Sequence, residues 1–344
     1  MRRPWLSAVA VVVVALVAAE AFVRWIDPQL PVVRAGDAAE MILKARRIDE
    51  ISKHSRKIDL VFFGTSMMDS AVAPQTFLDA STRFDTVYNA GVVGAPTATQ
   101  VRWAKEIVLN RLDPGVIVLG IHPIDLLLTD VLNLNIQPAQ ADVIFARVLR
   151  ETRPGMAGEV ERALNENFEL VRQRGNLRRP YVVADATWNR LRGNKPKGFI
   201  PLRDESFWAD HLTPMGESSL FHGEDGQFRI TAVQDQLRAN LRSDAFAVAD
   251  VHRLIKAAQS EKGAQVVIVI PPVPLDAWRE VAIDLGALRA GEELIKGIAS
   301  QYRIPVIDFT DVGYENELFA DLVHMNDQGA QRFSRDLSLA LNGR

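Results

Sequence analysis

Two short segments, far apart in the chain, carry the residue types of nucleophilic catalysis at a carbonyl group. Gly64-Thr65-Ser66 follows one apolar run, and Asp321-Leu322-Val323-His324 follows another. A serine hydroxyl attacks a carbonyl carbon when a base removes its proton, and an imidazole base needs a carboxylate to hold its tautomer. Ser66 is therefore the predicted nucleophile, His324 the base and acid, and Asp321 the orienting carboxylate. Either segment alone has a simpler explanation, a helix-capping serine or a loop with one capping acid.

The elements that must position these residues are predicted from the spacing of apolar residues. Apolar runs predict buried strands at 60–63, 116–119 and 266–270, and two short runs that each include one polar residue predict strands at 87–89 and 306–309. Stripes at spacings of three and four predict helices between the strands, and a final helix carries Ala330, Phe333, Leu337 and Leu341. Strands that alternate with helices predict an α/β fold with a mostly parallel sheet covered on both faces. Ser66 then lies at the carboxyl edge of the sheet, where such folds bind ligands.

Four segments resemble, in order, the sequence blocks of the SGNH/GDSL hydrolase family. They are Gly64-Thr65-Ser66, Asn89-Ala90-Gly91-Val92-Val93-Gly94, Gly120-Ile121-His122-Pro123, and Asp321 to Asn326 with Gly329. Each follows a predicted strand, and the resemblance spans residues 60–330 except for an insertion. It implies a flavodoxin-like three-layer sandwich with a five-stranded, mostly parallel sheet of order 2-1-3-4-5. Members with an N-terminal anchor and a Gly-x-Ser first block include polysaccharide O-acetylation proteins.

The same resemblance implies an oxyanion hole formed by the backbone N–H groups of Ser66 and Gly91. The third block departs from the family pattern, because His122 stands where an asparagine normally completes the hole. A neutral imidazole can donate one N–H, so His122 is a candidate third donor. Alternatively, His122 is a packing residue, and that donor is missing or comes from Asn133 or Asn135. The first block has Thr65 in place of aspartate, which removes no catalytic group.

The N-terminus has the pattern of a membrane-spanning helix. Arg2 and Arg3 precede an uncharged stretch from Pro4 to Ala19. About 20 apolar residues cross a bilayer, and positive charge before them favours a cytoplasmic N-terminus. Residues 1–26 are therefore predicted to be a signal-anchor in the cell membrane, which leaves the remaining chain outside the cytoplasm. The alternative is a signal peptide that is cleaved near Ala21 and releases a secreted domain.

Three further segments follow the anchor. Residues 27–57 are predicted to be a linker and lead-in helix, and residues 58–344 an SGNH hydrolase-like domain. About 145 residues separate the third and fourth strands, more than one crossover needs, so a largely helical insertion is expected at about 130–243. Its stretch from Arg172 to Arg203 is basic and contains Trp188. This stretch is either a solvated face or a rim that recruits an anionic polymer or lipid headgroup.

Composition excludes several other function classes. The chain has no cysteine, which rules out disulfides, thiolate metal sites and a cysteine nucleophile. Its formal net charge of −3 gives no bulk attraction to nucleic acid. The remaining histidines show no metal-ligand spacing; they are His54, His211, His222 and His252. Phosphate-loop and dinucleotide patterns are missing from the sequence. No metal and no cofactor is therefore predicted.

Together these features predict an extracytoplasmic serine ester hydrolase or O-acyltransferase that uses an acyl-enzyme intermediate. The expected substrate is an acylated carbohydrate of the cell envelope or another ester. A transferase outside the cytoplasm cannot draw on cytosolic acyl donors, so it would need a membrane acyltransferase partner to pass the acyl group across. A second hypothesis is a catalytically weak or inactive protein that binds glycan or scaffolds an envelope-modification complex. A lipid-directed esterase ranks third.

Overall fold

The computed structural model of the chain describes residues 4–30, 35–126, 205–222, 248–261 and 263–343. It also describes part of the segment 145–194 and the positions Leu237, Leu241 and Phe246. The chain divides into two compact units. The first unit combines Met1–Gly36 with Ala146–Arg203, and the second combines Asp37–Phe145 with Asp204–Arg344.

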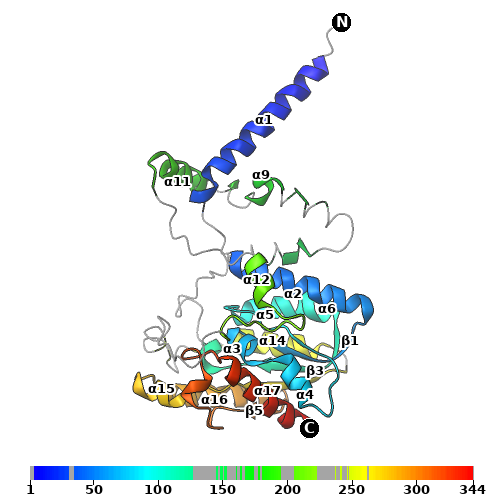
Figure 1. Cartoon of the computed structure of the whole chain (residues 1–344), viewed down its shortest axis with the longest axis vertical. Coiled ribbons are helices and arrows are strands. Elements are labelled where there is room, and N and C mark those ends of the chain that lie inside the picture. Colours follow the sequence, from blue (N-terminus) through cyan, green and yellow to red (C-terminus); the bar gives the residue numbers. More distant parts are fainter. Residues whose placement is uncertain are drawn as a thin grey trace. The chain divides into compact units, whose positions relative to one another are not determined.

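The first unit is helical. Its long helix α1 covers Pro4–Ile26 and continues into a 3-10 turn, η1, at Asp27–Gln29. The window Val9–Gln29 is long and apolar enough to cross a membrane. Two shorter helices pack against α1, namely α9 at Glu169–Arg172 and α11 at Pro180–Leu191 (Figure 1).

The second unit is built on a five-stranded parallel sheet of order β2-β1-β3-β4-β5, which is the expected order. The strands are β1 Lys57–Phe63, β2 Val87–Asn89, β3 Asp113–Gly120, β4 Gln265–Ile270 and β5 Val306–Asp308. The predicted strands are all present, and β1 and β3 begin three residues earlier than the apolar runs. They do so because Lys57 and Asp113 continue the parallel pairing of these two strands.

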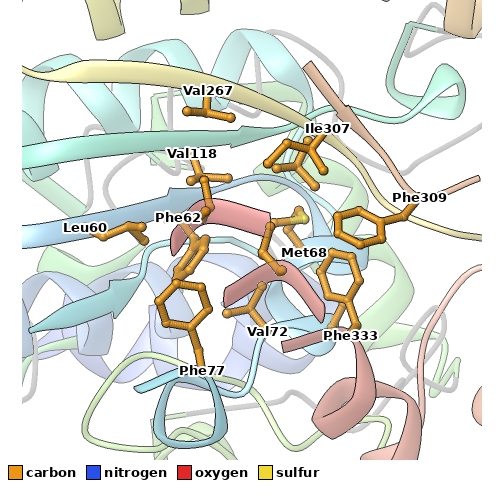
Figure 2. Packing of buried hydrophobic residues seen from close by; sticks show 14 of the residues in the cluster. Leu60, Phe62, Met68, Val72, Phe77, Val118, Val267, Ile307, Phe309 and Phe333 are labelled. Atoms are coloured by element: carbon orange, nitrogen blue, oxygen red, sulfur yellow. The ribbon is translucent and has the colours of Figure 1, made fainter. Parts of the chain in front are cut away.

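Helices α3 Ser66–Ala71, α4 Pro74–Asp79 and α17 Asp327–Asn342 pack on one face of the sheet. Figure 2 shows the core beneath them, where Phe62 meets Phe77 edge-to-face with ring centroids 5.2 Å apart. Phe309 and Phe333 make a similar pair at 5.0 Å. Each such pair contributes about 0.5–1.5 kcal/mol beyond the burial of its surface. This core therefore fixes α3, which begins at Ser66, against the strand ends.

The other face is covered by a second helical layer. It contains α2 Ala35–His54 and α14 Ala249–Gln259. It also contains one continuous helix made of three parts, namely α5 Thr97–Arg102, the π-helical η2 Trp103–Val108 and α6 Leu109–Arg111. α14 packs on α5, η2 and β4, and Arg111 of α6 donates to the carbonyl of Ala45 in α2 at 3.1 Å. The fold class is therefore α/β with three layers.

The remaining elements of the second unit lie in its connections. They are η3 Pro123–Leu126, α12 Glu205–His211, α15 Leu275–Glu280, α16 Leu285–Gln301 and η5 Asn316–Leu318. Trp278 of α15 and Leu288 of α16 are buried in one apolar cluster with Leu322, which precedes His324 by two residues. The indole N–H of Trp278 donates to the carbonyl of Leu322 at 2.7 Å. This contact ties the loop that carries Asp321 and His324 to α15.

Candidate active site

Ser66 lies at the carboxyl edge of the sheet, where the helix α3 begins beside the ends of β1 and β3. The chain leaves β1 at Phe63 and enters α3 at Ser66. A Cβ on Gly64 would lie 2.5 Å from Cβ of Met68, and one on Gly120 would lie 1.8 Å from Cγ of Met68. No side chain fits at such distances, so both glycines are needed for Met68 to pack over the ends of β1 and β3. The first turn of α3 is thereby held against the sheet.

Asp321 and His324 lie on one tight loop before α17. An antiparallel bridge between Phe319 and Met325 closes this loop. Within it, one carboxylate oxygen of Asp321 accepts the backbone N–H groups of Val323 at 2.8 Å and His324 at 2.9 Å. The loop therefore fixes the acid and the base relative to one another before any substrate is present.

The structure brings Ser66, His324 and Asp321 into one hydrogen-bonded chain. Nε2 of His324 lies 2.8 Å from Oγ of Ser66, and Nδ1 of His324 lies 2.8 Å from Oδ2 of Asp321. A carboxylate beside Nδ1 assigns the proton to that nitrogen, which leaves Nε2 to accept the serine hydroxyl. Burial raises the pKa of Asp321, but the charge and hydrogen bonds of His324 outweigh it, so the pKa is below its usual value. Asp321 is therefore an anion at neutral pH.

The expected oxyanion donors differ in their availability. The N–H of Ser66 opens α3 and so has no acceptor within the helix. The N–H of Gly91 donates to Oδ1 of Asn89 at 3.0 Å. Gly91 also allows a close approach, because a Cβ there would lie 3.0 Å from Cα of Asp69. An oxyanion can therefore use the N–H of Ser66 directly, whereas it must share the N–H of Gly91 with Asn89.

His122 is completely buried after β3. Its ring meets Trp278 edge-to-face, and Nδ1 accepts the N–H of Ile124 at 3.2 Å. Burial lowers the pKa of His122 to about 3, against the charge of Asp308, so the ring is neutral and its proton is on Nε2. Nε2 exposes no surface and has no hydrogen-bond partner among the described residues. A hydrogen-bond donor to an oxyanion must face the substrate, whereas Nε2 of His122 is enclosed. Of the two roles that the sequence left open for His122, oxyanion donor or packing residue, this geometry favours the packing residue.

Asp125 connects the third block to the residue before the serine. Its carboxylate accepts the N–H of His122 at 2.8 Å and a hydrogen bond from the hydroxyl of Thr65. Burial raises the pKa of Asp125 to about 6, although both hydrogen bonds oppose that rise. Thr65 therefore links the ends of β1 and β3 through its hydroxyl group.

A buried cation supports the site from α2. Lys44 donates to Oδ1 of Asp69 and to the carbonyl of Gly91, and its Nζ lies 3.1 Å from Oε1 of Glu40. The side chains of Lys44, Glu40 and Asp69 are wholly buried. Burial raises the pKa of Glu40 to about 8, although the charge of Lys44 opposes that rise. Burial also raises the pKa of Asp69, although the charge and hydrogen bond of Lys44 oppose that rise, so two buried carboxyl groups share the single cation.

The segment after α12 places an aromatic ring on the base. Phe221 stacks on His324 with ring centroids 3.8 Å apart and planes 4° from parallel. Two contacts hold this segment against β2 and α3. The carbonyl of Met215 accepts the N–H of Asn89 in β2 at 2.8 Å, and Nε2 of His222 lies 3.0 Å from the carbonyl of Ser70 in α3. Neither Phe221 nor Lys44 lies in a recognisable sequence motif, so their places in the site could not be predicted from the sequence.

Other expected or excluded sites can be placed only in part. Asn133 and Asn135, the alternative oxyanion donors, lie outside the described residues, as do residues 174–176, 179 and 195–203 of the basic stretch. Nδ1 of His252 lies 2.9 Å from the hydroxyl of Tyr302. Among the described residues, no group of His, Asp and Glu side chains has an arrangement that would hold a metal ion.

Comparisons with known proteins add little to this geometry. No protein-family model and no curated protein matches the chain. A solved structure that is similar to it is that of a "putative acylhydrolase" from Bacteroides fragilis, at 12% sequence identity and a TM-score of 0.38. The match covers 87% of this chain and 95% of that one. At this level of similarity, function must be argued from the site itself.

Proposed function

We propose that this protein is a serine ester hydrolase or O-acyltransferase that acts outside the cytoplasm on an acylated cell-envelope carbohydrate. One observation carries the proposal, namely the chain of two 2.8 Å contacts from Ser66 through His324 to Asp321. The lowered pKa of Asp321 keeps this carboxylate in the anionic form that the chemistry needs. The serine lies at a helix start where an oxyanion can be stabilised.

The first half-reaction forms an acyl-enzyme. Oγ of Ser66 attacks the ester carbonyl carbon while Nε2 of His324 takes the hydroxyl proton. The carbonyl oxygen becomes an oxyanion and accepts the N–H of Ser66, with the N–H of Gly91 shared between it and Asn89. The tetrahedral intermediate collapses, the carbon–oxygen bond to the alcohol breaks, and His324 returns the proton to the leaving alcohol. Asp321 stabilises the imidazolium between these steps.

The second half-reaction decides between hydrolysis and transfer. His324 takes a proton from an incoming hydroxyl group, whose oxygen attacks the acyl carbon. The bond from that carbon to Oγ of Ser66 then breaks, and His324 returns the proton to Oγ, which restores the free serine. Water as the acceptor gives a carboxylic acid, and a sugar hydroxyl gives a new ester. A helix that can span a membrane supports a location in or at the membrane. We propose that α1 is an uncleaved anchor with its N-terminus in the cytoplasm, so that the triad faces the envelope.

The test is active-site labelling of the full-length protein in detergent. A fluorophosphonate, which forms a covalent bond with an activated serine, labels the wild type and fails to label Ser66→Ala or His324→Ala. Ser260→Ala serves as a matched control, since Ser260 lies in the turn after α14; it labels like the wild type. Circular dichroism verifies that each variant is folded.

The opposite outcome supports a different function. If the folded wild type is not labelled, the proposed chemistry is refuted and a glycan-binding or scaffolding role is favoured. Two observations point in that direction: the N–H of Gly91 is already bonded, and Nε2 of His122 is enclosed. If labelling succeeds, incubating an acetyl ester with and without an oligosaccharide acceptor separates transfer from hydrolysis by the product formed.

A further inference from the structure

We propose that the first unit is a membrane-interface module. In this arrangement the outer end of α1 is part of the folded unit, and apolar side chains between residues 160 and 191 enter the headgroup region of the bilayer that α1 crosses. The inference rests on the proposed role of α1 as a membrane anchor, and it is independent of the chemistry at Ser66.

The outer end of α1 is hydrogen-bonded into the unit. Both carboxylate oxygens of Glu20 accept backbone N–H groups at the start of α9, from Glu169 and Leu170, each at 2.9 Å. Arg24 donates to Glu20 at 2.8 Å and to the carbonyl of Asn167 at 3.0 Å. These contacts satisfy two charges that would be costly to leave unpaired next to hydrocarbon. Cleavage near Ala21 would remove Glu20 and break them, so α1 is retained.

The depth of Glu20 fits the edge of the hydrocarbon. At about 1.5 Å per residue, the uncharged stretch from Pro4 to Ala19 covers about 24 Å of the roughly 30 Å apolar core of a bilayer, which places Glu20 near the outer edge of that core. Glu20 and the bound start of α9 then lie at the level of the headgroups. From Val9 to Val17, the large apolar side chains of α1 are exposed, as expected for a helix that is surrounded by lipid.

Helix α11 is fixed to the same end of α1 by its apolar face. Val182 and Ala186 are buried against Ile26 and Leu30, which end α1 and η1. The 3-10 turn adds a polar contact, because Gln29 donates to the carbonyl of Asn194 at 2.6 Å. The position and rotation of α11 relative to the end of α1 are therefore set by packing on its inner side.

The opposite side of α11 exposes large apolar groups. Tyr181, Trp188 and Leu191 are 70%, 55% and 67% exposed, and their spacings of seven and three place them on one face. The segment before α11 adds Val160, Leu164 and Phe168. In the part of the chain that the structure describes, the other exposed large apolar side chains outside α1 are Val312 and Leu339. Such a concentration on one unit marks an interaction surface.

The chemistry of this surface fits the interfacial zone of a phospholipid bilayer. Tyrosine and tryptophan prefer the headgroup level, where an apolar ring and a polar group are both satisfied. The guanidinium of Arg192 lies 4.2 Å over the ring of Trp188, and Arg178 and Arg190 are also exposed. Arginines at this level bind anionic headgroups. Because the surface adjoins the end of α1, the bilayer that α1 crosses is its occupant.

The experiment uses the absence of cysteine from the chain. Single cysteines are introduced as Trp188→Cys and Leu191→Cys, with Val12→Cys in α1 and Leu339→Cys in α17 as references, and each carries a nitroxide. The full-length proteins are reconstituted into vesicles of phosphatidylcholine and phosphatidylglycerol. Spin relaxation then compares collisions with oxygen, which concentrates in the bilayer, and with a nickel chelate, which stays in water. At positions 188 and 191 the oxygen-to-nickel ratio should lie between the ratios at 12 and 339.

Each contrary result has a distinct meaning. Ratios at positions 188 and 191 that equal the ratio at 339, with position 12 in the bilayer, overturn the interface module and leave the anchor intact. A ratio at position 12 that equals the ratio at 339 overturns the anchor itself. Protection of positions 188 and 191 from both reagents overturns lipid in favour of a protein partner. An intact mass that lacks the residues before Ala21 refutes the retention of α1.

Discussion

Replacing Lys44 by methionine removes the ammonium group that bridges Asp69, in the helix of the nucleophile, and the carbonyl of Gly91, after β2. Methionine has a similar length, so the change removes charge and hydrogen bonds rather than bulk. Asp69 then keeps a buried carboxyl group without its cation, and the carbonyl of Gly91 loses a donor. Both losses occur within the layer that supports Ser66.

The expected cost follows from burial. Removing one partner of a buried ion pair destabilises a protein by about 3–5 kcal/mol. At roughly 2–4 °C per kcal/mol for a large domain, the melting temperature falls by about 10 °C. The assay is thermal unfolding of the full-length protein in detergent, followed by circular dichroism. Lys53→Met, on an exposed position of the same helix α2, is the matched control and should change stability by less than about 0.5 kcal/mol.

A second variant separates charge from packing. Adding Asp69→Asn to Lys44→Met neutralises the stranded carboxylate, so the double variant should be more stable than the sum of the two single changes predicts. Equal melting temperatures of Lys44→Met and Lys53→Met would refute the reasoning, because removing the cation from a buried cluster should lower the stability of the folded protein. Strict additivity in the double variant would show that the charge of Lys44 does not act on Asp69.

The same cluster makes stability depend on pH. The pKa of Glu40 is raised by burial from 4.5 to about 8, so the folded state holds a proton that the unfolded state releases. This contribution is complete below pH 4.5 and is lost as the pH rises to about 8. Glu40→Gln stays neutral, so its melting temperature relative to the wild type should increase over this range. A difference that does not vary with pH would show that Glu40 is ionised in the folded protein.

Three further changes test the site. Asp321→Asn should lower the rate of fluorophosphonate labelling by about 10⁴-fold, because the tautomer of His324 is no longer held, and a loss below tenfold would remove Asp321 from the triad. Phe221→Ala should lower that rate about two- to tenfold, the equivalent of one stacked pair at about 0.5–1.5 kcal/mol, whereas an unchanged rate would make the stacking incidental. Gly120→Ala should destabilise the protein by about 1–3 kcal/mol through overpacking. Gly297→Ala is the control and should not destabilise it, because a Cβ there meets nothing within 4 Å. Equal melting temperatures of these two variants would contradict the packing argument.

The central strands β1, β3 and β4 could be predicted from local sequence because their carboxyl-terminal halves are buried on both faces and continuously apolar. The limits of a strand depend on contacts outside the strand itself. β5 ends at Asp308, one residue before the predicted end, because the carboxylate of Asp308 accepts the N–H of Thr310 at 2.9 Å and its hydroxyl at 2.7 Å. The N–H of Phe309 still donates to the carbonyl of Ile270 in β4 at 3.0 Å, so the turn at Asp308 ends the strand directly after this bond.

The supporting residues of the site could not be predicted in the same way. Lys44 lies in a segment that, by sequence, is an amphipathic helix, where a lysine is ordinarily solvated. Its burial depends on Asp69 and Gly91, which reach it only after the sheet has formed. Phe221 stacks on a histidine that lies far along the chain, and the segment around it has no apolar period. Such contacts are properties of the assembled fold, whereas the juxtaposition of Ser66 and His324 could be inferred from two strand ends at one edge.

The loop that carries Asp321 and His324 divides the triad into a rigid part and an adjustable part. The contact between acid and base closes within four consecutive residues and is reinforced by backbone hydrogen bonds, so it forms locally and persists through movements of the rest of the molecule. The contact from His324 to Ser66 joins segments separated by most of the chain, and its length depends on how α3 and the C-terminal loop pack on the sheet. Loosening of that packing would therefore first break the contact between His324 and Ser66, so that the serine is no longer activated. The contact between Asp321 and His324 would still be intact.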